Sequence, residues 1–298
     1  MRKRYLGDKK FYAAVMAVAV PIMIQNAITN FVGMLDNIMV GQVGTAQMSG
    51  VAIVNQLLFV FNLCIFGAVS GAGIFTAQFA GSKDHTGVRG TFRFKILICL
   101  LLTVLGVGIF LAAGEPLIRL YLKGEGQDQD AELFLRYGMD YLKVMLFGLL
   151  PFAFANAYSS TLRENGQTVI PMLSGIGAVL VNLVLNYIFI FGNFGVPAMG
   201  VRGAALATVI SRYAELAIVA VWTHTHVEKQ PFIQGAFRSM WIPPHLCKQI
   251  LAKGMPLLIN EALWAGGMAV LNQCYSLRSL DVVAATHISS TICNVFNV

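Results

Sequence analysis

The sequence has few charged residues. Asp, Glu, Lys and Arg make up 12% of the 298 residues, about half the share that soluble domains carry. Hydrophobic residues make up 57%, and the mean hydropathy is +0.69. They fall in long runs, too many for one core inside a polar surface. This composition excludes an ordinary soluble domain and predicts a membrane protein.

Motifs for catalysis and metal binding are also missing. The five cysteines are widely spaced without a Cys-x-x-Cys pair, and the five histidines are scattered. The sequence has neither a serine nucleophile motif nor a glycine-rich phosphate loop. We therefore expect a protein that is not an enzyme and that has no cofactor and no metal site.

Long uncharged stretches predict an all-α polytopic membrane protein, because about 20 apolar residues cross a bilayer as a helix. The eighth stretch is still apolar at Val298, so this span looks cut or only just complete. The predicted spans are 11–36, 48–78, 95–115, 133–157, 167–191, 200–222, 248–274 and 282–298.

Lys and Arg concentrate on one side of these spans. The N-terminal segment, residues 82–95, the Arg163 loop and residues 223–248 hold 13 of the 21, against 5 in the opposite connections. Basic residues are retained on the cytoplasmic side. We therefore expect a multi-pass protein of the cell (plasma) membrane with a cytoplasmic N-terminus.

The net charge of +7 has the same explanation. These basic residues lie where membrane topology needs them, so the charge does not indicate a nucleic-acid partner. The first apolar stretch is too long for a signal peptide. We expect the lipid bilayer as partner, no nucleic acid, and a first helix that is retained.

The chain carries a weak internal repeat. Sliding it along itself aligns Pro21 with Pro256, Ala27 with Ala262 and Asn37 with Asn272. Six predicted spans lie between the copies, so both enter the membrane in the same direction and form parallel repeats. We predict a six-helix lobe at 1–222, a cytoplasmic linker at 223–247, and the start of a second lobe, with two helices, at 248–298.

Two carboxylates lie within apolar stretches, Asp36 and Glu261. A carboxylate at membrane depth is costly and marks a functional site by default. Asn182 and Asn186 are four residues apart, so a helix presents both amides on one face. They could bind a cation or Asp36, or simply join helices as packing amides. Glu261 could instead pair with Lys253 or be solvated.

Other polar residues within the spans receive less weight. We expect them to line a cavity or to form hydrogen bonds between helices. They are Gln25, Asn26, Asn55, Gln56 and Asn156.

Several stretches resemble the multidrug and toxic compound extrusion (MATE) transporters. They are PIMIQNAITNFVGMLDNIMVGQVGTAQMSGVA, GAGIFTAQFAGSKD, LRENGQTVIPM, VNLVLNYIFIFGNFGVPAMGVRGAALATVIS and KGMPLLINEALW. The resemblance implies twelve helices in two six-helix lobes. This chain would then be truncated after about eight helices, with one lobe and the start of the next.

The resemblance also implies a function. MATE proteins are secondary antiporters that export amphipathic or cationic organic compounds in exchange for H⁺ or Na⁺ by alternating access. It assigns ion coupling to Asp36, Asn182 and Asn186, and to Glu261 in the second lobe. Many members have Asp where this chain has Asn186, which leaves the ion open. The complete protein is expected to be a monomer that binds small organic substrates.

Two alternatives stay open. A flippase for a lipid-linked saccharide would share the fold, but it needs a basic cavity for the pyrophosphate. No cluster of Lys or Arg stands out within the first six spans, which argues against it. The other alternative is a membrane fragment that does not transport.

Overall fold

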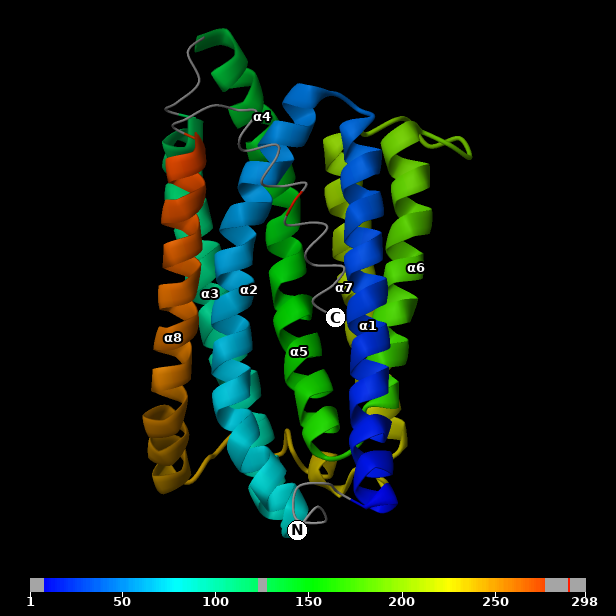
Figure 1. Cartoon of the computed structure of the whole chain (residues 1–298), viewed down its shortest axis with the longest axis vertical. Coiled ribbons are helices and arrows are strands. Elements are labelled where there is room, and N and C mark those ends of the chain that lie inside the picture. The colour runs from blue at the N-terminus through cyan, green and yellow to red at the C-terminus, as the bar shows by residue number, and fades with distance from the viewer. Residues whose placement is uncertain (1–7, 123–127, 277–288, 290–298) are drawn as a thin grey trace.

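The chain folds as a bundle of long helices (Figure 1). The computed structural model describes residues 8–122, 128–276 and 289, and these contain no strand, so the predicted all-α fold is confirmed. The helices are α1 (Lys9–Gly41), α2 (Thr45–Gly81), α3 (His85–Leu122), α4 (Asp128–Met145), α5 (Leu149–Glu164), α6 (Val169–Phe191), α7 (Val201–Thr225) and α8 (Pro244–Ser276).

Local signals set the helix ends. The Asp8 carboxylate accepts a hydrogen bond from the Phe11 N–H at 2.7 Å and caps α1. The Asp84 side chain accepts from the N–H groups of Thr86 and Gly87, both at 3.0 Å, and caps α3. Gly192 ends α6 at φ +76°, a left-handed conformation that favours glycine. These residues therefore fix the start of α1 and α3 and the end of α6.

The connections alternate between two ends of the bundle (Figure 1). We call the end that holds residues 82–84, 165–168 and 226–243 the basic end, and the other the opposite end. A short 3₁₀ turn, Leu146–Gly148, joins α4 to α5, so these two helices form one crossing. We call the helices α1 to α7 the first bundle.

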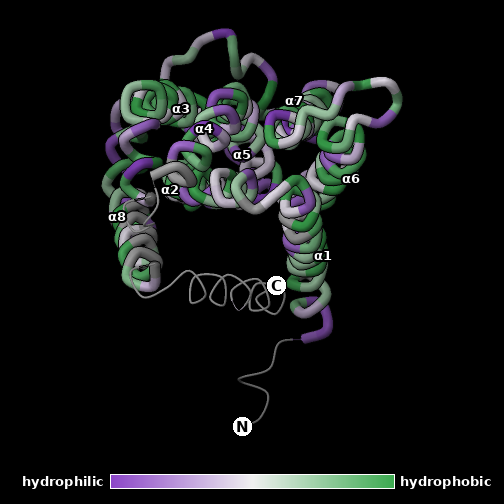
Figure 2. Tube along the Cα trace, turned by 90° about the horizontal axis from the view of Figure 1, so that it is seen from above, coloured by the Kyte–Doolittle hydropathy of each residue, from purple (hydrophilic) through white to green (hydrophobic). Residues whose placement is uncertain are grey.

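Six stretches of the described residues are long and apolar enough to cross a membrane. Large apolar side chains face outward on them, including Leu101, Val104, Leu111 and Val184, all more than half exposed. Figure 2 shows the apolar colouring around the helices. Apolar surface outside and polar groups inside suit a lipid solvent. The protein is therefore an integral membrane protein.

Three predicted spans need separate comment. The seventh forms α8, but α8 is not among the six, and it carries Lys248, Lys253 and Glu261 among its apolar residues. The eighth, 282–298, lies outside the described residues. The third predicted span began at residue 95, whereas α3 begins at His85, because a connection of only three residues separates it from α2.

The first bundle packs tightly inside. Its core contains the fully buried side chains of Ile65, Phe92, Ile118, Leu142 and Leu149. The helices α2 and α4 meet at Gly50, where a Cβ atom would lie 2.8 Å from the Phe134 carbonyl oxygen. Such close contact between helices is typical of membrane bundles.

Candidate functional site

Asp36 of α1 meets the asparagine pair of α6. The Asn186 amide donates to an Asp36 carboxyl oxygen at 2.6 Å and to the Asn182 oxygen at 3.0 Å. Asn182 and Asn186 are buried, with 6% and 1% of their surface exposed, and Asp36 is half-buried. The i, i+4 spacing on α6 places both amides against α1, as the sequence predicts.

The Asn182 amide also lies against Asp36. With its nitrogen turned toward α1, that nitrogen is 2.8 and 3.0 Å from the two Asp36 oxygens. Its oxygen then accepts from the Thr208 hydroxyl of α7 at 3.3 Å. In the opposite orientation the amide donates to Thr208 at 3.3 Å and its oxygen faces Asp36. The hydrogen bond from Asn186 to the Asn182 oxygen belongs to this second orientation. The site therefore spans α1, α6 and α7.

These two amide orientations match the two protonation states of Asp36. An ionised carboxylate accepts hydrogen bonds only, so it needs the amide nitrogen, whereas a protonated carboxyl group can donate to the amide oxygen. The buried Asn186 oxygen makes no hydrogen bond within the described residues. Carboxylate and amide oxygens are the ligands that hard cations prefer. The types of side chain at the site therefore suit a proton or a small cation.

The residues predicted to line a cavity fall into several environments. The Asn55 oxygen accepts from the Tyr141 hydroxyl of α4 at 3.2 Å. The Asn156 amide donates to the Phe152 carbonyl of its own helix at 2.9 Å. Gln25 packs at Gly175 of α6, where a Cβ atom would lie 3.0 Å from its amide nitrogen.

The exposure of the five residues also differs. Asn26 and Asn55 are exposed, whereas Gln25, Gln56 and Asn156 are half-buried. Among their contacts, those of Asn55 and Gln25 join two helices and that of Asn156 is local. The role of the five residues as cavity lining stays a prediction.

Glu261 does not join the Asp36 site. It is half-buried on α8, which lies on the other side of the molecule from α1 (Figures 1 and 2). Within the described residues no hydrogen bond or ion pair reaches its carboxylate. Its predicted role therefore rests on its place in an apolar stretch and on the resemblance.

A second polar cluster lies inside the first bundle, and sequence reasoning missed it. The fully buried Lys95 ammonium of α3 forms an ion pair with Glu164 of α5. It also donates to the hydroxyls of Ser160 at 2.6 Å and Thr161 at 3.3 Å. Ser160 in turn donates to the other Glu164 oxygen at 2.9 Å. Each charge is therefore paired and hydrogen-bonded.

This cluster corrects one prediction. Lys95 was assigned to a basic connection, 82–95, but it lies within α3 because that helix starts ten residues earlier. A second basic side chain within the spans, Arg212 of α7, is half-buried and stacks over the Phe152 ring at 4.8 Å. The spacing of Ser160, Thr161 and Glu164 on one helix was the signal available in the sequence.

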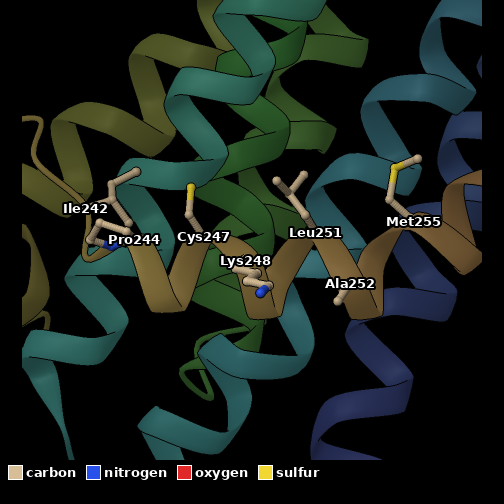
Figure 3. A pocket seen from close by; sticks show the side chains of 7 residues that line it. All are labelled: Ile242, Pro244, Cys247, Lys248, Leu251, Ala252 and Met255. Atoms are coloured by element: carbon tan, nitrogen blue, oxygen red, sulfur yellow. The ribbon is translucent and has the colours of Figure 1, made fainter.

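A hollow on the described surface lies elsewhere. It is a shallow, open groove of about 740 Å³ along the start of α8, lined by Lys248 and apolar side chains between Ile242 and Met255. Figure 3 shows Cys247, Leu251 and Met255 on the same side of the helix. None of the predicted site residues lines it.

Known proteins match this chain over most of its length. The MatE family model matches residues 21–188. A "Probable multidrug resistance protein NorM" of Thermotoga maritima is 28% identical over 281 residues, which are 92% of this chain and 57% of that protein. A protein of the same name from Bacillus subtilis is 26% identical and is covered to 60%. The chain therefore spans just over half the length of these relatives.

Solved structures share the fold. "Crystal structure of MATE in complex with MaD3S" matches with a TM-score of 0.79 at 23% identity, over 95% of this chain and 61% of that one. An outward-facing multidrug resistance MATE transporter matches with a TM-score of 0.74 at 24% identity, over 87% of this chain and 55% of that one. Because the family model covers more than half of the residues, the chain belongs to the MatE family.

Proposed function

We propose that the chain is the first part of a secondary antiporter that exports amphipathic or cationic organic compounds in exchange for H⁺ or Na⁺. The observation that carries the proposal is the contact of Asp36 with Asn182 and Asn186 inside a membrane bundle. A membrane carboxylate with such partners is typical of ion pathways. The two relatives named as multidrug resistance proteins support the class of substrate.

The proposed mechanism follows from the hydrogen bonds. Binding of H⁺ or Na⁺ neutralises Asp36. The Asn182 amide donates to the ionised carboxylate; after ion binding it accepts a hydrogen bond from the protonated carboxyl group or binds the cation through its oxygen. These hydrogen bonds join α1 to α6, so ion binding changes how α1 packs. Pro21 lies within α1 and removes one backbone hydrogen bond, which allows the helix to bend. Repacking of α1 then closes the substrate cavity during alternating access.

Glu261 is proposed as the second ion site. Its matched position in the first repeat is Asn26, not Asp36, so the two repeats differ chemically. The remaining ligands would come from the part of the relatives that this chain does not span. The proposed lobes, 1–222 and 248–298, follow the same repeat.

The basic end is proposed to face the cytoplasm, since the segments predicted on that side hold 13 of the 21 Lys and Arg in the sequence, or 12 without the buried Lys95. We expect a cysteine placed at the exposed Phe194, at the opposite end, to react with a membrane-impermeant maleimide in intact cells. A cysteine at the exposed Gln234 should react only after the cells are opened. The reverse pattern would invert the topology.

The buried basic residues do not favour a flippase. A pyrophosphate site needs unpaired positive charge, whereas the Lys95 ammonium is neutralised by Glu164 and shielded from solvent. Arg212 donates to the Gly148 carbonyl at 3.4 Å and stacks on Phe152, so it holds the break between α4 and α5. The ion-coupled exporter is therefore preferred.

Transport in proteoliposomes tests the proposal. The complete gene product is reconstituted, a fluorescent organic cation is loaded, and either an H⁺ or a Na⁺ gradient is imposed with the membrane potential clamped. We expect one of the two gradients to drive the dye against its own gradient. If neither ion gradient drives the dye, the chain is not part of such an antiporter.

A further inference from the structure

The segment between α7 and α8 is not a loose connection. Phe232, Ile233 and Ala236 are buried, with 0%, 4% and 1% of their surface exposed. The Phe232 ring packs edge-on against Phe92 of α3 with the ring centroids 5.4 Å apart. Gln230, 1% exposed, accepts from the Asn165 amide at 2.7 Å. Residues 230–242, which we call the strap, therefore lie against the first bundle.

Two arginines of α3 hold the backbone of the strap. Arg93 donates to the carbonyls of Ala236 at 2.7 Å, Gly235 at 2.8 Å and Trp241 at 3.2 Å. Arg89, one turn earlier, donates to those of Phe232 at 3.1 Å and Pro231 at 3.4 Å. Hydrogen bonds from a charged donor contribute more than neutral ones. Arg93 binds both the middle and the end of the strap, so it holds the strap more firmly than Arg89 does.

The start of α8 continues this attachment. Leu246 and Ile250 are 4% and 2% exposed and form a small core with Ala72 of α2 and Phe94 of α3. One turn further, Gly254 meets Gly71 of α2, where a Cβ atom on Gly71 would lie 2.6 Å from the Gly254 Cα. No side chain fits between these backbones. From residue 230 to Gly254 the chain is therefore fixed to the first bundle.

Pro256 lies just beyond the Gly254 contact and removes one backbone hydrogen bond of α8. The apolar side chains on either side of it, Leu251 and Leu257, are 47% and 39% exposed. Further along α8, Trp264 approaches Phe59 of α2 with the ring centroids 6.0 Å apart. The missing hydrogen bond makes Pro256 the point of α8 where we expect a bend.

We propose that Arg93 fastens the strap so that residues 230–254 move with the first bundle, and that the movement of the second repeat is taken up in α8 at Gly254–Pro256. This inference rests on the proposed function only in that it assumes a transport cycle. Arg93 acts as a positioning residue, because it fixes the strap and the start of α8. The helical turn that carries Glu261 follows this part of α8. The strap is then a part of the first bundle rather than a flexible linker.

Distances between spin labels test this proposal. The five native cysteines are replaced, and labels are placed at exposed positions on α6 and α8 in the complete gene product. The pair Leu173–Gln249 spans the fixed region, and Leu180–Leu263 reports on α8 beyond Pro256. Between ion-loaded and substrate-loaded protein, we expect the first distance distribution to stay single and narrow and the second to shift. A shift of both pairs, or of neither, would overturn the proposal.

Variants of Arg93 complete the test. Arg93→Ala should broaden the Leu173–Gln249 distribution, whereas Arg238→Ala should not, because exposed Arg238 joins the strap through its backbone N–H. Arg93→Lys keeps the charge but lacks the planar guanidinium group, so it should broaden the Leu173–Gln249 distribution less. It serves as a second variant if Arg93→Ala does not fold. An unchanged distribution in both Arg93 variants would overturn the role of Arg93.

Transport provides a separate readout. We expect Arg93→Ala to slow ion-driven efflux at least about tenfold with unchanged substrate affinity, because it disturbs the movement and not the binding site. Unchanged efflux would overturn the role of Arg93 in the cycle. A wild-type protein without efflux would contradict the proposed function instead, and the label distances of the Arg93 variants could still be read.

Discussion

The Asp36→Asn variant is expected to lose ion-driven efflux, at least about 100-fold in rate, while it still folds. An asparagine has nearly the same shape and can still accept the Asn186 hydrogen bond, which is 2.6 Å long in the native protein. It cannot be ionised, so it neither releases a proton nor supplies a charged ligand. The loss would therefore come from the coupling step. Efflux of a fluorescent organic cation from proteoliposomes measures it.

Asp140→Asn is the matched control. Asp140 is also an aspartate of the first bundle, but it forms an ion pair with the exposed Arg202 at 2.9 Å. Exposed pairs contribute about 0–1 kcal/mol to stability, so this variant should transport normally. Equal efflux by wild type and Asp36→Asn at equal expression would remove Asp36 from the mechanism.

The Lys95→Met variant is expected to destabilise the protein by about 3 kcal/mol, because it leaves the Glu164 carboxylate without its partner in the interior. It also removes the donor to the Ser160 and Thr161 hydroxyls. For a chain of this size the loss corresponds to a fall in apparent Tm of roughly 10 °C. Thermal unfolding in detergent, followed by fluorescence-detected gel filtration, measures it.

The double variant Lys95→Met/Glu164→Met distinguishes the effect of losing the whole ion pair from the effect of leaving one charge unpaired. Replacing both charges of a buried pair with apolar groups is often neutral, because the cost of desolvating the charges also disappears. We therefore expect the double variant to recover most of the lost Tm. If the double variant is no more stable than Lys95→Met alone, the ion pair is not what makes Lys95 important.

The sequence predicted the helices and the Asp36 contact well. Long uncharged runs have few alternatives to a helix in lipid, because every backbone group must be hydrogen-bonded within the segment. The i, i+4 spacing of Asn182 and Asn186 required both amides to face the same neighbour. Asp36 was the acidic residue at a matching depth, so the contact with Asn186 followed from charge and geometry.

Other features depend on tertiary packing that no local pattern records. Thr208 is an ordinary residue in an apolar helix, and it joins the site only because α7 packs on α6. Lys95 ends a run of basic residues and looks like part of a connection. Its burial depends on Glu164, 69 residues later in the chain. The strap has the prolines of a loop, yet Arg93 holds it in place.

The most direct test of the central claim is ion exchange on substrate binding. In a weakly buffered solution of the purified complete protein, binding of an organic cation should release protons, or Na⁺ should compete with it, because ion and substrate favour different states. The Asp36→Asn variant should bind the compound without either effect. Binding that is independent of pH and Na⁺ in the wild type, or linked equally in the variant, would contradict the account.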